Sequence, residues 1–319
     1  MRFVRIYSQQ LTPCLRRGQD FQLSKRIIFA LCFLLLASNA AISDEIAPLH
    51  IGNFSLPSSQ QPGAFYSFGS NIIKKGQCQI AFTPDIFKST GERYIEYSTN
   101  ILYGTTEKSS LLLIIPSELE YKNKNNNLHY YGFGDITLQG EYAFYDQASY
   151  IDTKQIAGIF GITVPSGAQK IGYQRAAYFI GSTINYVAQE WLSYLSPGVL
   201  LFAGSEKIRP GTQWYVDLGV GKNITSKANQ HIALALLEIN AQYNATSPSD
   251  KFTPRTKQSG NVVTDGYLFY LSPSLFYSTP SMIYQVGFSV PIVQHWANTS
   301  NVVDYYVACN LTWTLNKTT

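Results

Sequence analysis

Long apolar runs are absent from this sequence after residue 43, and apolar residues there do not recur with the spacing of a helix. A membrane-spanning helix needs about 18 or more consecutive apolar residues, and no later segment approaches that length. Charged residues are also scarce, at 14% of the 319 residues. These absences exclude a helical membrane protein and argue against a helical soluble domain.

Residues suited to catalysis are few. The chain has four histidines and no Gly-x-Ser-x-Gly motif, and only His129 and His295 fall in predicted outer loops, where an enzyme site near the membrane could form. A serine or carboxylate hydrolase needs a histidine base beside its other catalytic groups. Histidine, cysteine and carboxylate residues do not cluster with metal-ligand spacing either. We predict that the protein is not an enzyme and has no catalytic, cofactor-binding or metal-binding residues.

The first 43 residues have the pattern of a cleaved signal peptide. Lys25 and Arg26 precede an apolar run of about eleven residues, 27–37, and small residues follow it. As a helix this run would rise only about 16 Å, too little to cross a hydrocarbon core of about 30 Å, so an uncleaved anchor is the weaker alternative. Six of the 24 basic residues and one of the 20 acidic residues lie in this leader, which leaves 18 and 19 and removes the formal net charge of +4. The remaining chain therefore gives no support to a nucleic-acid partner.

Two of the four cysteines, Cys14 and Cys32, belong to the leader, so Cys78 and Cys309 remain. They fall in the predicted first and last strands, which become neighbours when a barrel closes. A disulfide across that seam, in an oxidising compartment, is one interpretation. The other is that both are small apolar wall residues facing lipid, and the offset of several residues between them favours it.

Residues 132–145 show a period of two, which is the period of a β-strand. Polar side chains occupy one face and apolar side chains the other: Asp135, Thr137, Gln139 and Glu141 against Ile136, Leu138, Tyr142 and Phe144. The last strand repeats the pattern, with Trp313 and Leu315 on its apolar face. Many such strands behind a secretion signal predict a transmembrane barrel that is apolar towards lipid and polar towards its lumen.

About twelve segments share this pattern, and each is long enough to cross an outer membrane at a tilt. They are 78–88, 92–104, 110–121, 134–146, 154–165, 177–189, 194–204, 213–222, 230–243, 265–277, 281–293 and 302–315. The fold class predicted is all-β: an antiparallel up-and-down β-barrel of about 12 strands in the bacterial outer membrane. A soluble β-sandwich is the alternative, but the inner faces would be too polar to pack together.

The connections between these segments alternate in length. Apart from 89–91, the odd-numbered connections are long and polar, as in 122–128 and 246–260, whereas even-numbered ones such as 278–280 are short. Long outer loops and short periplasmic turns are typical of outer-membrane barrels. The expected organisation is therefore a leader at 1–43, a periplasmic or lumen-plugging segment at 44–76 and the barrel at 77–319.

Three motifs carry a resemblance to a known family: Gly-Phe-Gly-Asp-Ile-Thr-Leu-Gln-Gly-Glu-Tyr at 132–142, Val-Pro-Ser-Gly at 164–167, and residues 65–77 before the first strand. Through them the chain resembles, over 60–319, the outer-membrane barrel family labelled "MetA-pathway of phenol degradation". The resemblance implies a transporter, and by this route alone small solutes that are hydrophobic or aromatic. Asp135 within the first motif has two interpretations, a hydrogen-bond partner of loop glycines or a contact for solute.

Acidic residues outnumber basic ones on the predicted inner face, where the basic residues are chiefly Arg93 and Lys154. The acidic positions, expected to line the lumen, are Glu96, Glu118, Glu120, Asp135, Glu141, Asp217 and Glu238. A wall of this charge would favour cations. The alternative is a closed polar core in which these acids pair with lysines and arginines of the loops.

These features predict a passive, porin-like transporter for small solutes. The alternative is a structural or adhesive surface barrel without an open pore, whose loop lysines and arginines could contact lipopolysaccharide phosphates. The expected partners are membrane lipid and lipopolysaccharide, a small solute, and the barrel-assembly machinery acting on the C-terminal strand. Neither a cofactor nor a nucleic-acid partner is expected.

Overall fold

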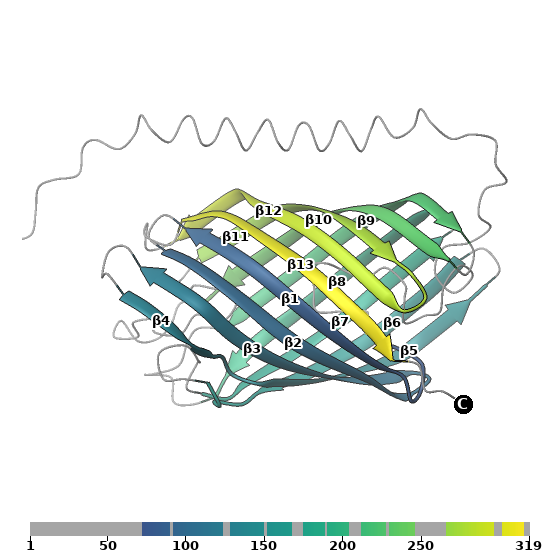
Figure 1. The fold of residues 1–319 in the computed structure, drawn as a ribbon, viewed down its shortest axis with the longest axis horizontal. Helices are drawn as coiled ribbons and strands as arrows, with labels where there is room; N and C mark the ends of the chain where they lie inside the picture. Colours follow the sequence, from purple (N-terminus) through teal and green to yellow (C-terminus); the bar gives the residue numbers. More distant parts are fainter. Residues whose placement is uncertain are drawn as a thin grey trace, which may run out of the picture. The chain divides into compact units, whose positions relative to one another are not determined.

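Strands and the turns between them make up the described part of the chain (Figure 1). The computed structural model of the protein describes residues 72–89, 92–123, 128–149, 152–167, 175–188, 190–203, 212–227, 230–245, 266–296 and 302–315. All of these belong to the unit Ile46–Thr319. The predicted signal peptide and most of the predicted segment 44–76 lie outside the described residues. No described helix is long and apolar enough to cross a membrane.

Thirteen strands form one sheet. Their bounds are β1 Cys78–Ser89, β2 Glu92–Thr106, β3 Ser109–Asn123, β4 Leu128–Phe133, β5 Thr137–Ala148, β6 Asp152–Thr163, β7 Ala177–Ala188, β8 Trp191–Phe202, β9 Gln213–Lys227, β10 His231–Asn244, β11 Gly266–Ser278, β12 Met282–Trp296 and β13 Val303–Leu315. Each strand pairs antiparallel with its neighbours in the sheet. The predicted segments and the observed strands agree closely.

The sheet closes on itself because β1 pairs with both β2 and β13. β3 pairs with β5 through residues 109–114 and with β4 through residues 117–123, so β4 and β5 occupy a single position in the wall. The barrel therefore has twelve wall positions, and the predicted twelve-stranded antiparallel barrel is confirmed. The predicted segment 134–146 begins three residues later than expected, as β5 at Thr137. The connection expected before it contains the additional strand β4, which Gly134, Asp135 and Ile136 separate from β5.

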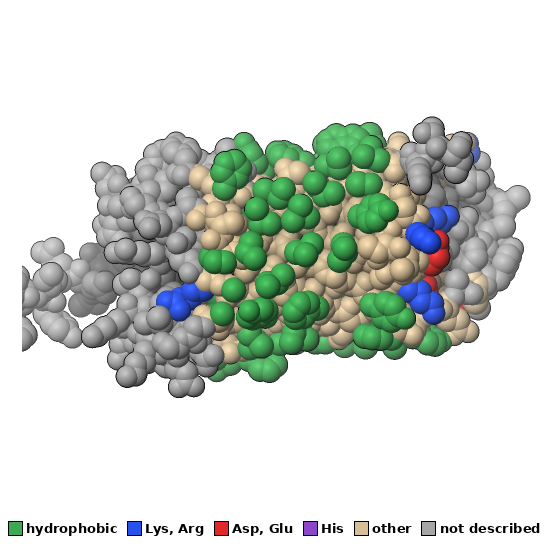
Figure 2. Space-filling model, turned by 90° about the horizontal axis from the view of Figure 1, so that it is seen from below, with side chains coloured by type: hydrophobic (Ala, Val, Ile, Leu, Met, Phe, Trp, Pro, Cys, Tyr) green, Lys and Arg blue, Asp and Glu red, His purple; other side chains and the backbone are tan. Residues whose placement is uncertain are grey.

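Side chains alternate between a buried inner face and an exposed outer face. On β9, Trp214, Val216, Leu218 and Val220 are 46–53% exposed, whereas Asp217 between them is 3% exposed. Figure 2 shows the result on one side of the barrel, with hydrophobic side chains across the middle and basic side chains only towards the two ends. Such a belt is the surface that lipid covers in an outer-membrane barrel.

The two ends of the barrel differ in their connections. At the end where β1 begins and β13 finishes, the strands are joined by short links such as Glu107-Lys108 and Thr279-Pro280-Ser281. The longer connections lie at the opposite end, and much of them is outside the described residues. By the rule for outer-membrane barrels we name these the periplasmic end and the outer end.

Residues 72–77 approach β1 along the inner face. The N–H of Ile73 donates to Ser110 Oγ at 3.0 Å, and Ile73 is only 3% exposed. The carbonyl of Lys74 lies where a side chain of Gly104 would be, because a Cβ there would come within 2.0 Å of it. Gly76 has a φ of 78°, which glycine adopts readily in the turn before β1. Since Ser110 and Gly104 are buried on the inner side of the wall, the chain enters β1 from the lumen side at the periplasmic end.

Cys78 and Cys309 are free, as the wall-residue interpretation predicted. Cys78 pairs with Leu315 of β13, six residues beyond Cys309. At about 3.4 Å per residue this offset is about 20 Å, far beyond the span of a disulfide.

Candidate functional site in the barrel lumen

A row of hydrogen bonds crosses the inner face on β9, β10 and β11. Ser272 Oγ donates to Asn240 Oδ1 at 2.7 Å, and Asn240 Nδ2 donates to Asp217 Oδ1 at 3.0 Å. All three side chains are at most 3% exposed. The row holds the Asp217 carboxylate in a fixed position, and Asp217 has further interactions besides this one.

Towards the periplasmic end, Tyr194 on β8 reaches Glu238 on β10. Its hydroxyl donates to Glu238 Oε1, and to do so its ring lies over the intervening strand at Gly219. A Cβ at Gly219 would come within 2.3 Å of the Tyr194 ring carbons. Glycine is therefore required there for the ring to reach the carboxylate.

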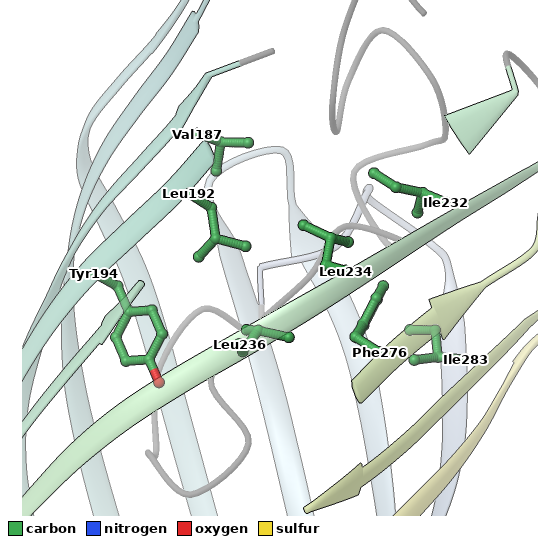
Figure 3. Close-up of a cluster of buried hydrophobic side chains, with 8 residues drawn as sticks. All are labelled: Val187, Leu192, Tyr194, Ile232, Leu234, Leu236, Phe276 and Ile283. Carbon is green, nitrogen blue, oxygen red and sulfur yellow. The ribbon is translucent and has the colours of Figure 1, made fainter. Parts of the chain in front are cut away.

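An apolar cluster covers the inner face nearest the periplasmic end (Figure 3). Its members come from β7, β8, β10, β11 and β12, and all are at most 9% exposed: Val187, Leu192, Tyr194, Ile232, Leu234, Leu236, Phe276 and Ile283. On β10 the inner face changes along the strand, from Ile232, Leu234 and Leu236 to Glu238 and then to the amides of 240–244. The alternating pattern predicted a polar lumen, and this apolar part of the inner face corrects that prediction.

Three buried polar side chains of β11 and β12 each have one atom without a hydrogen-bond partner in the structure: Ser274 Oγ, Gln285 Nε2 and Ser289 Oγ. The residues are 3%, 6% and 0% exposed and lie on β11 and β12. Gln285 is directly opposite Phe276, and Ser274 is opposite Leu236. Unpartnered buried polar groups are costly, so these positions are suited to water or to a polar solute.

Four of the predicted lumen acids lie on the inner wall. Glu96 on β2, Glu141 on β5, Asp217 and Glu238 are 8%, 4%, 3% and 0% exposed. Each has interactions within the chain beyond those described above. The inner wall thus brings carboxylates from both sides of the barrel into one interior.

The two remaining wall acids lie further out. Glu118 and Glu120 belong to the part of β3 beyond its pairing with β5, and the register places Glu118 between Glu96 and Gly132. Position 120 is instead opposite the outward Ile95, so, contrary to the prediction, it is not on the inner face. This part of β3 extends towards the outer end with β4. The arrangement of their side chains lies outside the described residues.

Asp135 sits at the break between β4 and β5 and is 0% exposed. Its Oδ1 accepts the N–H of Gly167 at 2.7 Å, and Ser166 Oγ accepts the N–H of Ile136 at 2.9 Å. Two of the motifs that carried the family resemblance therefore contact each other. The geometry matches the interpretation of Asp135 as a hydrogen-bond partner of a loop glycine.

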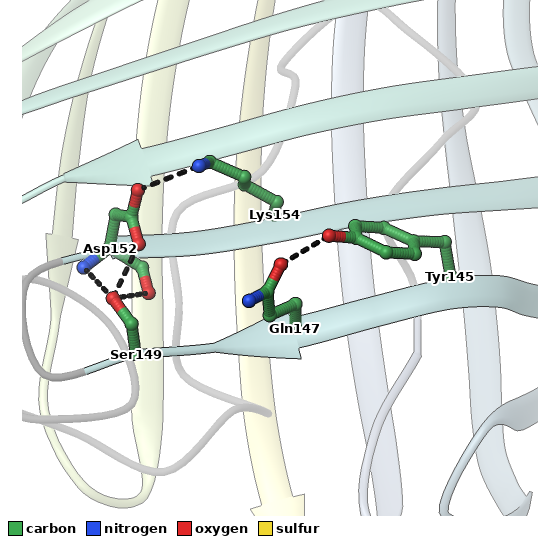
Figure 4. A network of polar contacts seen from close by, with 5 residues as sticks. All are labelled: Tyr145, Gln147, Ser149, Asp152 and Lys154. Carbon is green, nitrogen blue, oxygen red and sulfur yellow. Dashed lines mark hydrogen bonds and ion pairs between the residues drawn. The ribbon is translucent and has the colours of Figure 1, made fainter.

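Arg93 and Lys154 are not inner-face residues, contrary to expectation. Arg93 is exposed and is the cross-strand partner of Lys88. Lys88 is two residues after the outward Ile86 on β1, so both cations are on the outer face. Lys154 lies at the periplasmic end, 5.8 Å from the centre of the Tyr186 ring and 3.2 Å from Asp152 (Figure 4). Asp152 also accepts a hydrogen bond from Ser149 in the same turn. Cations at the rim can point outwards because their long stems reach the headgroup region.

One inner-face acid was missed. Asp85 on β1 is 8% exposed, and its Oδ2 accepts the hydroxyl of Tyr306 on β13 at 3.0 Å. The alternation of Gln79 and Thr83 with Ile80 and Phe82 could have revealed it. The described residues contain no group of three or more His, Cys, Asp or Glu side chains placed to hold a metal ion.

The sequence matches no protein-family model and no curated protein. Among solved structures, an outer membrane channel from Pseudomonas putida is similar, with a TM-score of 0.58, 10% identity, and coverage of 80% of this chain and 99% of that one. The fold is that of an outer-membrane β-barrel. The NanC porin and LpxR from Salmonella typhimurium give TM-scores of 0.45 and 0.43, each at 9% identity, and cover 74% of this chain and 100% and 99% of theirs. The barrel fold and its lipid-facing belt place the protein in the bacterial outer membrane.

Proposed function

We propose that the barrel is a passive channel for small solutes and that its lumen favours cations over anions. The observation that carries this proposal is the charge of the inner wall. Five carboxylates from β1, β2, β5, β9 and β10 face inwards, and no lysine or arginine does so among the strand residues whose side chains are described. The acids are Asp85, Glu96, Glu141, Asp217 and Glu238.

Charge of one sign inside a narrow wall has a physical consequence. Field lines are focused by the low-dielectric barrel, so the local concentration of the opposite ion rises. Acidic rings select for cations in channels by the same effect. The similarity of the fold to an outer membrane channel supports the channel part of this proposal.

The apolar cluster adds a second preference. A solute that has left the carboxylates and amides would next meet Leu236, Phe276 and Ile283 on its way to the periplasm. The family resemblance independently implies hydrophobic or aromatic solutes. We therefore expect small organic cations with an apolar portion to pass more readily than small anions.

The proposal is tested by liposome swelling with purified protein and matched pairs of small organic cations and anions. The expected result is faster swelling with cations, and a smaller difference in the variant Glu96→Gln with Glu141→Gln. The matched control is Glu107→Gln, because Glu107 is an exposed acid in a periplasmic turn. Equal rates for cations and anions in the unmodified protein would overturn the preference.

A closed barrel with a structural or adhesive role is the second candidate. The observation in its favour is the burial of the inner acids, none of which is more than 8% exposed. Their hydrogen bonds to Tyr194, Asn240 and Tyr306 also resemble those of a fixed polar core. Liposomes that hold correctly folded barrel and do not swell with any solute would favour this candidate.

A further inference from the structure

Two basic residues face each other on the lipid side of the barrel at its outer end. Lys88 on β1 and Arg93 on β2 are direct partners across the antiparallel pair. The next pair inwards is Ile86 with Ile95, and the outward residues beyond it, Ile80 and Phe82, are 37% exposed. The two cations therefore lie where the apolar belt ends.

This pairing is unfavourable without a counter-ion. Side chains directly opposite each other in an antiparallel pair have Cβ atoms about 5 Å apart, and like charges at that distance repel. Neither Lys88 nor Arg93 forms an ion pair with a carboxylate of the described residues. The ammonium of Lys88 lies 5.6 Å from the centre of the Tyr305 ring, which supports one cation without neutralising it.

The register continues the basic row along the sheet. Lys122 of β3 is the partner of Arg93 on its other side, so positions 88, 93 and 122 lie side by side on three adjacent strands. The row lies next to the turn that joins β1 to β2, at the outer end of the barrel. Headgroups of the outer leaflet are expected at this level. The side chain of Lys122 is outside the described residues, so Lys88 and Arg93 are the two basic side chains that an anion would meet in this row.

Lys154 and Lys222, two cations on the outward face at the periplasmic end, are arranged differently. Lys154 pairs with Asp152 at 3.2 Å, and Lys222 lies 5.3 Å from the centre of the Trp191 ring and has further interactions within the chain. The aromatic support is therefore common to both ends. Among the described strands, two cations that are direct cross-strand partners and form no ion pair with a described carboxylate are found only at the outer end. This asymmetry points to an anion that is present in the outer leaflet.

We propose that Lys88 and Arg93 bind a phosphate group of lipid A, the membrane anchor of lipopolysaccharide. The guanidinium of Arg93 offers two parallel N–H donors to phosphate oxygens, and the Lys88 ammonium adds a point charge beside it. The acyl chains of the same lipid would cover Ile86, Ile95 and the apolar belt below them. The site lies on the outside of the wall, so it does not depend on whether the lumen conducts.

The test is native mass spectrometry of the full barrel in detergent, titrated with lipid A that carries two phosphates. The variant is Lys88→Gln with Arg93→Gln, and the matched control is Lys154→Gln with Lys222→Gln at the periplasmic end. We expect the control to bind as the unmodified protein does, and the outer-end variant to lose about tenfold or more in affinity, as expected when charge-assisted hydrogen bonds are removed. Heat-modifiable migration on gels checks that each variant is folded.

Two further arms use the unmodified protein alone and do not depend on the variants. Lipid A without phosphates should bind more weakly than the form with two, and inorganic phosphate should compete poorly, because it lacks the acyl chains that contact the belt. Equal binding of both lipids, full competition by inorganic phosphate at equal concentration, or unchanged affinity of the folded outer-end variant would each overturn the proposal.

Discussion

Tyr194 and Glu238 are joined by a hydrogen bond across three strands, with the Tyr194 ring lying over Gly219 on the strand between them. The three residues come from β8, β9 and β10 and fix the relative positions of these strands inside the barrel. On β10, Glu238 lies between the apolar Ile232, Leu234 and Leu236 and the amides of 240–244. The pair is therefore a structural junction between the two kinds of inner surface.

Removing the Tyr194 hydroxyl should destabilise the barrel. In Tyr194→Phe the buried Glu238 carboxylate loses one donor, which costs about 1–3 kcal/mol. Urea unfolding of the purified barrel, followed by tryptophan fluorescence, measures the change in the free energy of unfolding. The matched control is Tyr243→Phe, because Tyr243 is 48% exposed on the opposite face of β10. Equal effects of the two substitutions would contradict the role given to the pair.

Gly219→Ala should act on the same junction from the other side. The new Cβ would occupy the place of the Tyr194 ring, so the ring must move and the bond to Glu238 must lengthen or break. We expect a loss of stability similar to that of Tyr194→Phe and little additional loss when the two are combined. If the two losses of stability add in the double variant, the Tyr194 ring does not pass over Gly219 to reach Glu238.

Asp135 is expected to hold the 164–167 connection in place. Asp135→Ala removes the acceptor for the Gly167 N–H, which at a buried site should cost about 1–3 kcal/mol and loosen this connection. Limited proteolysis of folded protein should then cut near residues 164–167 faster than in the unmodified barrel. Asp146→Ala is the control, since Asp146 is an exposed acid towards the opposite end of β5. Unchanged cleavage would show that the hydrogen bond does not order the connection.

The lipid-facing side of the last strand is tested at Trp313, which is 40% exposed beside Ile80 of β1. Trp313→Asp places a charge on the lipid-facing surface. For a basic residue the loss of stability ranges from about 0–1 kcal/mol near the interfaces to about 2–4 kcal/mol at the midplane, and it is smaller for an acidic residue. We expect less folded barrel in the outer membrane, measured by heat-modifiable migration. The control variant Trp313→Phe should give the normal level of folded barrel. A normal level of folded barrel in the Asp variant would count against an outward Trp313.

Much of the barrel could be predicted from alternation alone. Strand β13 is an example, because Thr312 and Thr314 are buried while Trp313 and Leu315 are exposed, as the period of two predicts. Lipid on one side and polar groups on the other leave a clear pattern wherever the two faces differ in polarity. The twelve wall positions and the alternating connections followed from the same pattern.

The apolar part of the lumen could not be predicted in this way. On β10 the inward Ile232 and Leu234 alternate with the apolar Ala233 and Ala235, so both faces look alike in sequence. The contact of Tyr194 with Glu238 depends on the stagger between β8, β9 and β10, which a single sequence does not encode locally. Arg93 and Lys154 were misplaced because a rule of polar residues inwards fails at the rims, where outward cations reach headgroups and water.

The entry of residues 72–77 along the inner face bears on the role proposed for the segment before them. Ile73 and Lys74 contact the lumen side of β2 and β3, so these residues lie at the periplasmic mouth of the lumen. A lumen-plugging role for residues 44–76 remains a prediction. Deleting residues 44–71 keeps the described contacts and should raise the conductance of the barrel.

Single-channel recording in planar bilayers shows directly whether the lumen conducts ions and which sign of charge it prefers. We expect discrete conductance steps from the purified barrel and, in a salt gradient, a reversal potential of the sign for cation selectivity. That selectivity should weaken as salt rises, because the Debye length falls from about 10 Å at 0.1 M to about 3 Å at 1 M. Folded protein that gives no steps, both at full length and without residues 44–71, would contradict the channel and leave the closed structural barrel in its place.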